Sequence, residues 1–300
     1  MPPSADQAQL AEGVWTLALD TPTLPPATAT NTLILGGDRL LIVEPATPHA
    51  REQAKLDALL AALRAEGRTL AGVLVTHHHV DHVGYAEALR EAHEIPIYAH
   101  PQTASRLDFA VDHEVDDGWT IELGDGHTVE AVHTPGHAPG HLLAWDRKTG
   151  IAHAGDLVAG EGTILVDVRD GGDMGVYLDS LRRMAARVRA DPSGSVRFVP
   201  AHGPVLDDPV AVLEHYLAHR LAREDKVRQA VLEQGRRTFM GILASAYADT
   251  PKRLWPLAGL ALEAHLRKLV DDGELVREGL GARPSSPLGN LPQPSTKNGS

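Results

Sequence analysis

Seven consecutive residues, 76–82, read THHHVDH, and they constrain the fold more than any other stretch of the chain. Neutral imidazole nitrogens and carboxylate oxygens are donors that a zinc ion accepts. The apolar run 70–75 directly before them is typical of a buried strand. A strand end holds side chains rigidly, so the sequence predicts a metal site here rather than a loose histidine tract. The candidate donors are His77, His79, Asp81 and His82.

Three later segments supply further donors. Successive side chains point in different directions, so four donors from one loop cannot all bind one tetrahedral ion, and we expect a second ion. His137 lies in the glycine- and proline-rich stretch 133–141, whose tight turn can aim one imidazole inward. Asp156 and His202 each follow a short apolar run. This arrangement is expected when several strands deliver ligands to one rim.

The order and spacing of these donors resemble the metallo-β-lactamase superfamily, whose signature His-x-His-x-Asp-His is followed along the chain by His, Asp and His. The resemblance implies an α/β fold, a four-layer αββα sandwich with helices outside two central sheets. It also implies two zinc ions, with iron or manganese as alternative metals. It assigns His77, His79 and His137 to one ion and Asp81, His82 and His202 to the other, with Asp156 bridging them.

Other residues near the motif do not fall on ligand positions of the superfamily. His78, His133, His141 and His153 are expected to hydrogen-bond to ligands or to have no role, and the side chain of His78 should point away from the ligands. Many members carry Asp-Thr-Gly after the strand equivalent to 40–43, where this chain has Glu44 followed by proline and alanine. Glu44 either orients a ligand histidine with its longer arm or is a solvated charge at a strand end.

The spacing of apolar residues predicts the main strands and helices of residues 1–209. Apolar alternation predicts strands over 14–19, 32–35 and 40–43, with a hairpin turn at 36–38. Apolar residues at helical spacing predict helices over 50–66, 84–93 and 175–189. The amino end of the second of these helices could favour anionic groups near the metal loop.

From residue 208 onward, the sequence pattern changes from mixed strands and helices to mainly helices. The pattern predicts helices over 210–234, 239–248 and 257–269 and a short strand over 275–277, which is the order of a winged-helix module. We therefore expect a catalytic domain over 1–209, a linker helix and winged-helix-like domain over 210–280, and a disordered tail over 281–300 that is rich in proline, serine and glycine.

Several short segments narrow the resemblance to one subgroup. The stretches 134–141, 172–174, 219–224 and 264–269 are similar to bacterial relatives of lactamase-beta-like protein 2, an endoribonuclease subgroup of the superfamily. This similarity favours RNA as a substrate.

The net charge of −12 argues against RNA. Residues 210–280 hold 11 basic and 10 acidic side chains and two more basic residues follow, so residues 1–209 carry −15. A domain that acidic repels RNA broadly. Six basic residues of the C-terminal module could form a local nucleic-acid face, although such charges are more often simply solvated. They are Arg236, Arg237, Lys252, Arg253, Arg267 and Lys268.

The chain has no cysteine, which removes disulfides and thiolate ligands. This also excludes the metallo-β-lactamase subclass that binds zinc through cysteine. No apolar run reaches the roughly 20 residues that span a bilayer, and the amino end lacks the pattern of a signal peptide. We expect a soluble cytoplasmic protein with no membrane partner; the sequence does not indicate its oligomeric state.

The metals imply the reaction type. A zinc ion lowers the pKa of bound water from about 15.7 to about 7, so two ions would hold a bridging hydroxide as the nucleophile. Asp156 as the bridge and Asp81 as the proton relay are the candidate catalytic residues. We expect hydrolysis of an acyl bond in a small thioester, ester or lactone. The alternatives are metal-dependent endonucleolytic cleavage of single-stranded RNA and a non-enzymatic metal-dependent regulator.

Overall fold

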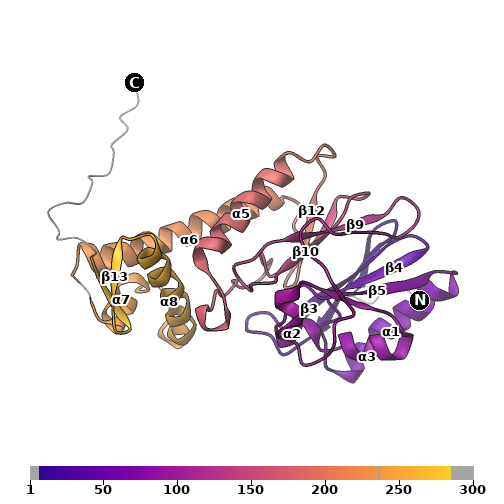
Figure 1. The fold of residues 1–300 in the computed structure, drawn as a ribbon, viewed down its shortest axis with the longest axis horizontal. Coiled ribbons are helices and arrows are strands. Elements are labelled where there is room, and N and C mark those ends of the chain that lie inside the picture. Colours follow the sequence, from indigo (N-terminus) through magenta and orange to yellow (C-terminus); the bar gives the residue numbers. More distant parts are fainter. Residues whose placement is uncertain (1–6, 236, 285–300) are drawn as a thin grey trace. The chain divides into compact units, whose positions relative to one another are not determined.

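The computed structural model describes residues 7–235 and 237–284, and the described chain divides into two compact units (Figure 1). The first, the sandwich unit, runs to Ile164 and resumes over Asp170–Leu217. The second, the C-terminal unit, comprises Leu165–Arg169 and the residues from Ala218 onward. The division falls inside the long helix that the sequence analysis assigns as a whole to the C-terminal domain, because the first turns of this helix belong to the sandwich unit.

Two sheets form the centre of the sandwich unit. The larger has the strand order β1-β2-β3-β4-β5-β6-β7, antiparallel from β1 to β4 and parallel from β4 to β7. Its strands are β1 (Gln7–Ala11), β2 (Val14–Asp20), β3 (Ala29–Leu35), β4 (Arg39–Val43), β5 (Thr69–Leu74), β6 (Ile97–Ala99) and β7 (His113–Glu114). The smaller has the order β12-β11-β10-β9-β8, and only β11 and β12 are parallel. Its strands are β8 (Thr120–Glu122), β9 (Thr128–His133), β10 (Leu142–Asp146), β11 (Ile151–Gly155) and β12 (Arg197–Pro200).

Side-chain alternation along the strands creates the layers. On β4, Leu40 and Ile42 pack with residues of the first long helix, whereas Leu41 and Val43 pack with residues of the smaller sheet. On β10, Leu142 and Ala144 face the larger sheet. The helices are α1 (Ala50–Ala65), α2 (Val80–Val83), α3 (Ala86–His93), α4 (Pro101–Ala104) and α5 (Met174–Arg189), with a 3-10 turn η1 (Val168–Asp170).

Helix α5 supplies the outer layer on the smaller sheet, where the guanidinium of Arg187 lies 5.5 Å from the ring centre of Trp145 on β10. The α/β four-layer sandwich expected from the sequence is therefore confirmed. The helix predicted over 84–93 is corrected in one respect. A separate single turn, α2, carries Asp81 and His82 within the metal loop, and α3 begins only at Ala86.

The C-terminal unit contains a winged-helix module, as predicted. Three helices and a two-stranded wing share one apolar core that includes Val231, Leu243, Leu262 and Leu275. The elements are α6 (Pro209–Leu232), α7 (Phe239–Ala246), the 3-10 turn η2 (Lys252–Leu254), α8 (Trp255–Asp271), β13 (Leu275–Glu278) and β14 (Gly281–Pro284).

The expected start of the tail at residue 281 is wrong, because the wing extends to residue 284. Residues 281–284, which composition assigns to a disordered tail, form β14 and pair in antiparallel fashion with β13. Glycine and proline are common in linkers. In residues 281–284, however, pairing with β13 provides hydrogen-bond partners for the backbone polar groups. The remaining residues, 285–300, lie outside the described part of the chain. Among the described helices, none is long and apolar enough to cross a membrane.

Candidate metal centre

Three imidazole nitrogens converge beyond the end of β5. Nε2 of His77 lies 3.0 Å from Nδ1 of His79, and Nε2 of His137 lies 3.2 and 3.1 Å from those two atoms. Three mutually adjacent nitrogens cannot all be paired as donor and acceptor, because at least two must share a protonation state. A tetrahedral zinc ion, with Zn–N distances of about 2.0–2.1 Å, holds its nitrogens about 3.3–3.4 Å apart. The triangle therefore has the size of one face of a zinc tetrahedron.

A second cluster adjoins the first and contains one carboxylate and two imidazoles. Nε2 of His82 lies 3.5 Å from Oδ1 of Asp81, and Nε2 of His202 lies 3.6 Å from Oδ2 of the same residue. The ligand atoms of these three side chains all lie within 4.8 Å of one another. This set suits a second divalent ion.

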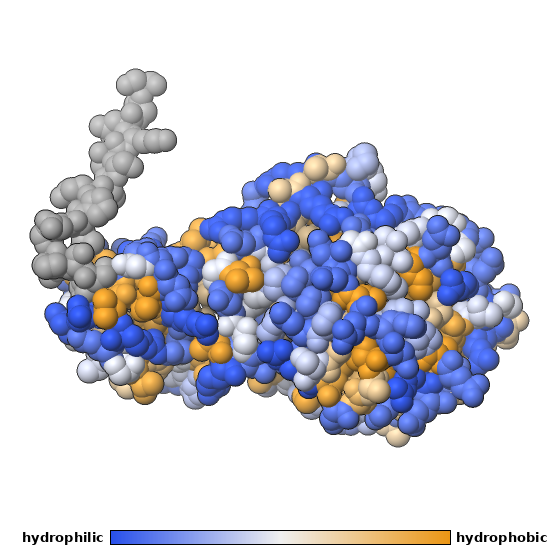
Figure 2. Space-filling view, in the orientation of Figure 1, coloured by the Kyte–Doolittle hydropathy of each residue, from blue (hydrophilic) through white to orange (hydrophobic). Residues whose placement is uncertain are grey.

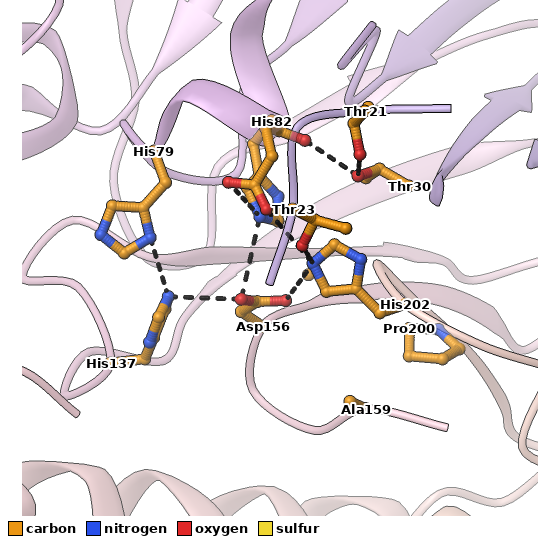
Figure 3. A network of polar contacts seen from close by, with 12 residues as sticks. Thr21, Thr23, Thr30, His79, His82, His137, Asp156, Ala159, Pro200 and His202 are labelled. Carbon is orange, nitrogen blue, oxygen red and sulfur yellow. Dashed lines mark hydrogen bonds and ion pairs between the residues drawn. The ribbon is translucent and has the colours of Figure 1, made fainter. Parts of the chain in front are cut away.

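The carboxylate of Asp156 lies between the two clusters, as Figure 3 shows. Its Oδ2 is 3.4 Å from Nε2 of His137 in the first cluster and 3.8 Å from Nε2 of His82 in the second. Its Oδ1 is 3.5 Å from Nε2 of His202. The structure thus brings all seven residues predicted from the sequence to one place, in the two groups that the resemblance implies.

Buried atoms without partners provide a test of whether metal ions fit. Nε2 of His82 and Oδ1 of Asp156 are buried and have no hydrogen-bond partner among the described residues. Leaving such an atom unsatisfied costs about 1–3 kcal/mol. Divalent cations bound to the two clusters would satisfy both atoms, so the residues fit a pair of metal ions.

The carboxylate of Glu44 sets the tautomers of two candidate ligands. Its Oε1 accepts hydrogen bonds from Nδ1 of His82 and, at 2.5 Å, from the hydroxyl of Thr76. The hydroxyl proton of Thr76 is used in this way, so its oxygen accepts from Nδ1 of His77 at 3.0 Å. Both histidines are left with Nε2 directed at the metal positions.

This arrangement decides the question that the sequence left open about Glu44. The residue is fully buried, not solvated. Its backbone φ is 61°, in the left-handed region that side chains other than glycine rarely adopt. The hydroxyl of Thr32 donates to its carbonyl oxygen at 2.8 Å, and its own N–H donates to the carbonyl oxygen of Leu74 at 3.0 Å. These bonds hold the strained backbone.

Glu44 and His82 form a buried ion pair. Burial alone raises the pKa of Glu44, but the charges of His82 and His153 and the hydrogen bonds from His82 and Thr76 lower it to about 2. Burial alone lowers the pKa of His82, but the charges of Glu44 and Asp156 raise it to about 10. Without a metal, His82 therefore carries a proton on Nε2 at neutral pH, and a cation must displace it.

Asp170 is a site residue that the sequence analysis misses. Its Oδ2 lies 2.7 Å from Nε2 of His79 and 3.0 Å from Nε2 of His78. The first contact fixes His79 with Nδ1 directed at the metal position. The contact with His78 revises the expectation that this side chain points away from the ligands, because His78 and His79 share one carboxylate. No periodic signal precedes Asp170 in the sequence, and it lies 91 residues from His79.

The other histidines of the region support the ligands. Nε2 of His141 accepts the backbone N–H of Asp156 at 2.9 Å, and its Nδ1 contacts the hydroxyl of Thr134 at 2.8 Å. Burial lowers the pKa of His141 to about 3, so the ring stays neutral and can accept that bond. A Cβ on Gly155 would come within 2.4 Å of Nε2 of His141, so only glycine fits there.

Contacts of three further histidines complete the set. Nε2 of His153 donates to the carbonyl oxygen of Asn31 at 2.7 Å, and its Nδ1 lies 3.1 Å from Oε2 of Glu44. Nδ1 of His202 donates to the carbonyl oxygen of Ala29 at 2.9 Å, which leaves Nε2 for a metal. His133 donates from Nε2 to the carbonyl oxygen of Pro139 at 2.8 Å and stacks on His100.

A four-layer α/β sandwich with two adjoining histidine and aspartate clusters at one rim defines a class of metal-dependent hydrolases. The sequence model of the metallo-beta-lactamase superfamily matches residues 25–190, more than half of the chain, so this chain belongs to that superfamily. The model of the beta-lactamase associated winged helix domain matches residues 238–283.

Two relatives agree with this assignment. A beta-lactamase-like protein 2 homolog from Caenorhabditis elegans is 30% identical over 251 residues, which cover 81% of this chain and 79% of that protein. An atrochrysone carboxyl ACP thioesterase from Emericella nidulans is 30% identical over 254 residues, which cover 83% of this chain and 76% of that protein. The resemblance to relatives of lactamase-beta-like protein 2 is thereby confirmed.

Solved structures show the same fold. A beta-lactamase domain protein from Burkholderia ambifaria aligns with a TM-score of 0.78 and 23% identity, over 95% of each chain. A metallo-beta-lactamase family protein from Thermus thermophilus aligns with a TM-score of 0.73 and 21% identity, over 92% of this chain and 100% of that one. Both alignments include most of the C-terminal unit as well as the sandwich.

The role of Glu44 can be tested by removing its charge. Glu44→Gln should weaken zinc binding by about 10- to 100-fold, because His82 loses its ionic partner and its fixed tautomer. Affinity is measured by competition with a chromogenic chelator. The matched control is Glu52→Gln, which alters another buried glutamate that contacts Asp20 and Lys55 instead. Equal affinities of the two variants would contradict the assignment.

Asp170 and His78 should differ in their effects. Asp170→Asn should lower zinc affinity or kcat by about 10- to 100-fold, because a neutral amide is a weaker acceptor than the carboxylate and no longer fixes the tautomer of His79. His78→Ala should have a smaller effect, since Asp170 still accepts from His79. Metal titration and steady-state kinetics on both variants decide this. A larger loss in His78→Ala than in Asp170→Asn would reverse the two roles.

Proposed function

We propose that the protein is a dinuclear zinc hydrolase that cleaves an acyl bond in a thioester, ester or lactone. The observation that carries the proposal is the position of Asp156, whose two oxygens lie within 3.4–3.8 Å of nitrogen donors from both clusters. The nitrogen and oxygen donor set suits zinc, and iron or manganese are the alternative metals. The relative named as an ACP thioesterase supports an acyl substrate.

The residues then have distinct tasks. When bound, the two ions would supply an activated water and polarise the scissile carbonyl. Asp156 would hold both ions at a fixed separation. The side chain of Asp81 is 17% exposed, compared with 11% for Asp156, so it is the more accessible carboxylate. We assign Asp81 to pass a proton to the leaving group.

The surroundings of the site favour an apolar substrate. Val80, between the donors His79 and Asp81, is 70% exposed. Leu24 is 53% exposed and follows Thr23, whose hydroxyl lies 3.4 Å from Nε2 of His202. Exposed apolar side chains beside the donors favour hydrocarbon groups over a phosphate backbone.

RNA cleavage remains the alternative, and the pairing of two of the six basic residues weighs against it. Lys268 lies 3.2 Å from Glu224 and 2.6 Å from Asp272, and Arg267 lies 3.9 Å from Asp271. Paired cations attract phosphates less than free ones. Arg236, another member of the expected patch, lies outside the described residues. The third alternative, a non-enzymatic regulator, has no support from the relatives, one of which is named as a thioesterase.

Metal removal tests the catalytic centre. The purified protein should contain about two metal ions per chain and lose hydrolysis when a chelator removes them. Asp156→Ala should lower the metal content and reduce kcat by orders of magnitude, since one carboxylate would serve both ions. Mass spectrometry of the metals measures the first result. A stoichiometry near zero after expression in zinc-supplemented medium would refute the site.

Salt dependence separates the two substrate classes. RNA binding should fall steeply with ionic strength, with a log-log slope of about −0.7 per phosphate contact, whereas a neutral acyl substrate should show almost none. We expect turnover of at least one thioester or lactone and weak RNA binding at physiological salt. Parallel assays use acyl thioesters, lactones, a β-lactam and single-stranded RNA. Submicromolar RNA affinity at about 150 mM salt would favour the endoribonuclease instead.

A further inference from the structure

The buried imidazole of His100 lies outside the metal centre, at the start of the short helix α4. Its Nδ1 accepts the backbone N–H of Gln102 at 3.1 Å and so caps this single helical turn. Its Nε2 lies 3.4 Å from Oδ1 of Asp116. An ionised carboxylate accepts hydrogen bonds and cannot donate them, so Nε2 carries the ring proton and Nδ1 is the acceptor. Only the neutral ring, in this one tautomer, satisfies both contacts.

Helix α4 supports the carboxyl-terminal side of the loop that carries His137. The hydroxyl of Thr103, a buried residue of α4, donates to the carbonyl oxygen of Gly140 at 2.9 Å. A Cβ on Gly140 would lie 2.5 Å from that hydroxyl oxygen and 3.0 Å from Nδ1 of His100. The loop backbone therefore lies directly against the capped turn, and the position of Gly140 depends on the cap.

The amino-terminal side of the same loop has separate supports on α5. The hydroxyl of Ser180 donates to the carbonyl oxygen of Pro135 at 2.7 Å, and the backbone N–H of Asp173 donates to that of Gly136 at 2.8 Å. Neither contact uses a side chain that gains a proton near neutral pH. His137 lies between the two sides of the loop, so a change at α4 alters its direction while α5 still holds the other side.

Several groups facing His100 act on its protonation. Burial and the charge of His133, whose ring centre is 4.2 Å away, lower the pKa of His100 below its ordinary value, and the carboxylates of Asp116 and Glu114 oppose this shift. The cap is therefore complete at neutral pH and is lost as the pH falls through the lowered pKa. Protonation of His133 would not break its bond to Pro139, because Nε2 donates in both states.

The charge of the whole chain favours the bound proton. Hydrophilic residues cover most of the face that Figure 2 shows, and the net charge is −12. A negative field of this kind favours the protonated form of an imidazole. When Nδ1 of His100 gains a proton, its N–H and the N–H of Gln102 face each other, and the cap is lost.

His100, Asp116 and His133 also have ligand atoms within 4.8 Å of one another, but they suit a metal ion poorly. An ion on Nε2 of His100 would move the ring proton to Nδ1 and break the cap. The rings of His100 and His133 are also nearly parallel, with 13° between their planes, so their lone pairs point along separate planes. The cluster is better suited to bind a proton.

We propose that the neutral ring of His100 is a positioning residue for His137, and that its protonation releases the first turn of α4 and, through Gly140, the loop that carries His137. The inference rests on the proposed metal-dependent function, in which His137 is a zinc ligand. It gives zinc binding an acid-sensitive control outside the ligand set. Loss of a helix cap corresponds to about a 2- to 30-fold change in an equilibrium, and we expect a change of this size in zinc affinity.

Asparagine at position 100 separates the cap from the charge, because its side-chain oxygen caps helices and does not titrate. His100→Asn should match the wild-type zinc affinity within about twofold at about pH 7.5 and exceed it at least about threefold at about pH 5. His100→Ala has no acceptor and should lose about tenfold already at about pH 7.5. The matched control is His93→Asn on α3, which should follow the wild type at both pH values.

Affinities are measured by competition with a chromogenic chelator on the full-length protein. All variants share the same ligand histidines, so the titration of these ligands cancels in each ratio of variant to wild type. Thr103→Val should lose affinity at neutral pH as His100→Ala does, whereas Thr103→Ser, which keeps the hydroxyl, should not. A ratio of His100→Asn to wild type that is the same at both pH values would overturn the proposal, as would equal affinities of His100→Asn and His100→Ala at neutral pH.

The metal-free protein provides a readout that does not depend on zinc. On acidification, the backbone amide resonances of Thr103 and Gly140 should shift in the wild type and in His93→Asn, and stay nearly constant in His100→Asn. If no form binds zinc but these resonances respond as expected, the metal-dependent function fails and the acid-sensitive contact between α4 and the loop stands. If the resonances shift equally in His100→Asn and the wild type, His100 is not the group that responds to acid.

Discussion

The geometry of the candidate metal centre depends on the hydrogen bonds that the buried carboxylate of Glu44 accepts. This carboxylate accepts directly from His82 and, through the hydroxyl of Thr76, determines how His77 is protonated. These two histidines belong to different clusters, so one carboxylate orients a donor of each. A buried charge of this kind is strongly unfavourable unless it is paired and hydrogen-bonded. The sandwich supplies that pairing because the end of β4 lies beside the end of β5, with which it pairs in parallel.

The two sheets determine where the remaining donors lie. Donors follow β5 and β9 as well as β11 and β12, so residues far apart in sequence meet at one rim. Alternation along β4 and β10 fills the space between the sheets with aliphatic side chains, which leaves the polar residues to gather at the strand ends. The neutral ring of His141 ties the loop after β9 to the backbone of Asp156. The same strands thus determine both the packing between the two sheets and the positions of the candidate metal ligands.

The sequence predicted the features that are local. The short spacing within 76–82 and the strand ends before His137, Asp156 and His202 were sufficient to select seven candidate donors, and the structure brings these seven side chains together. It could not identify Asp170, because that residue reaches His79 only through the tertiary fold. The burial of Glu44 depends on a left-handed backbone that composition does not reveal. Residues 281–284 have the composition of a linker, and only pairing with β13 makes them a strand.

The ion pair between Glu44 and His82 has a consequence for how the protein matures. In the absence of metal, the imidazolium of His82 places a positive charge next to Asp156 and Asp81, where a cation would otherwise be needed to balance those carboxylates. In the metal-free protein, the proton on His82 thus supplies positive charge where the ion would supply it. This balance of charge would favour the folded chain before a metal binds, whereas small zinc domains are unfolded without their ion.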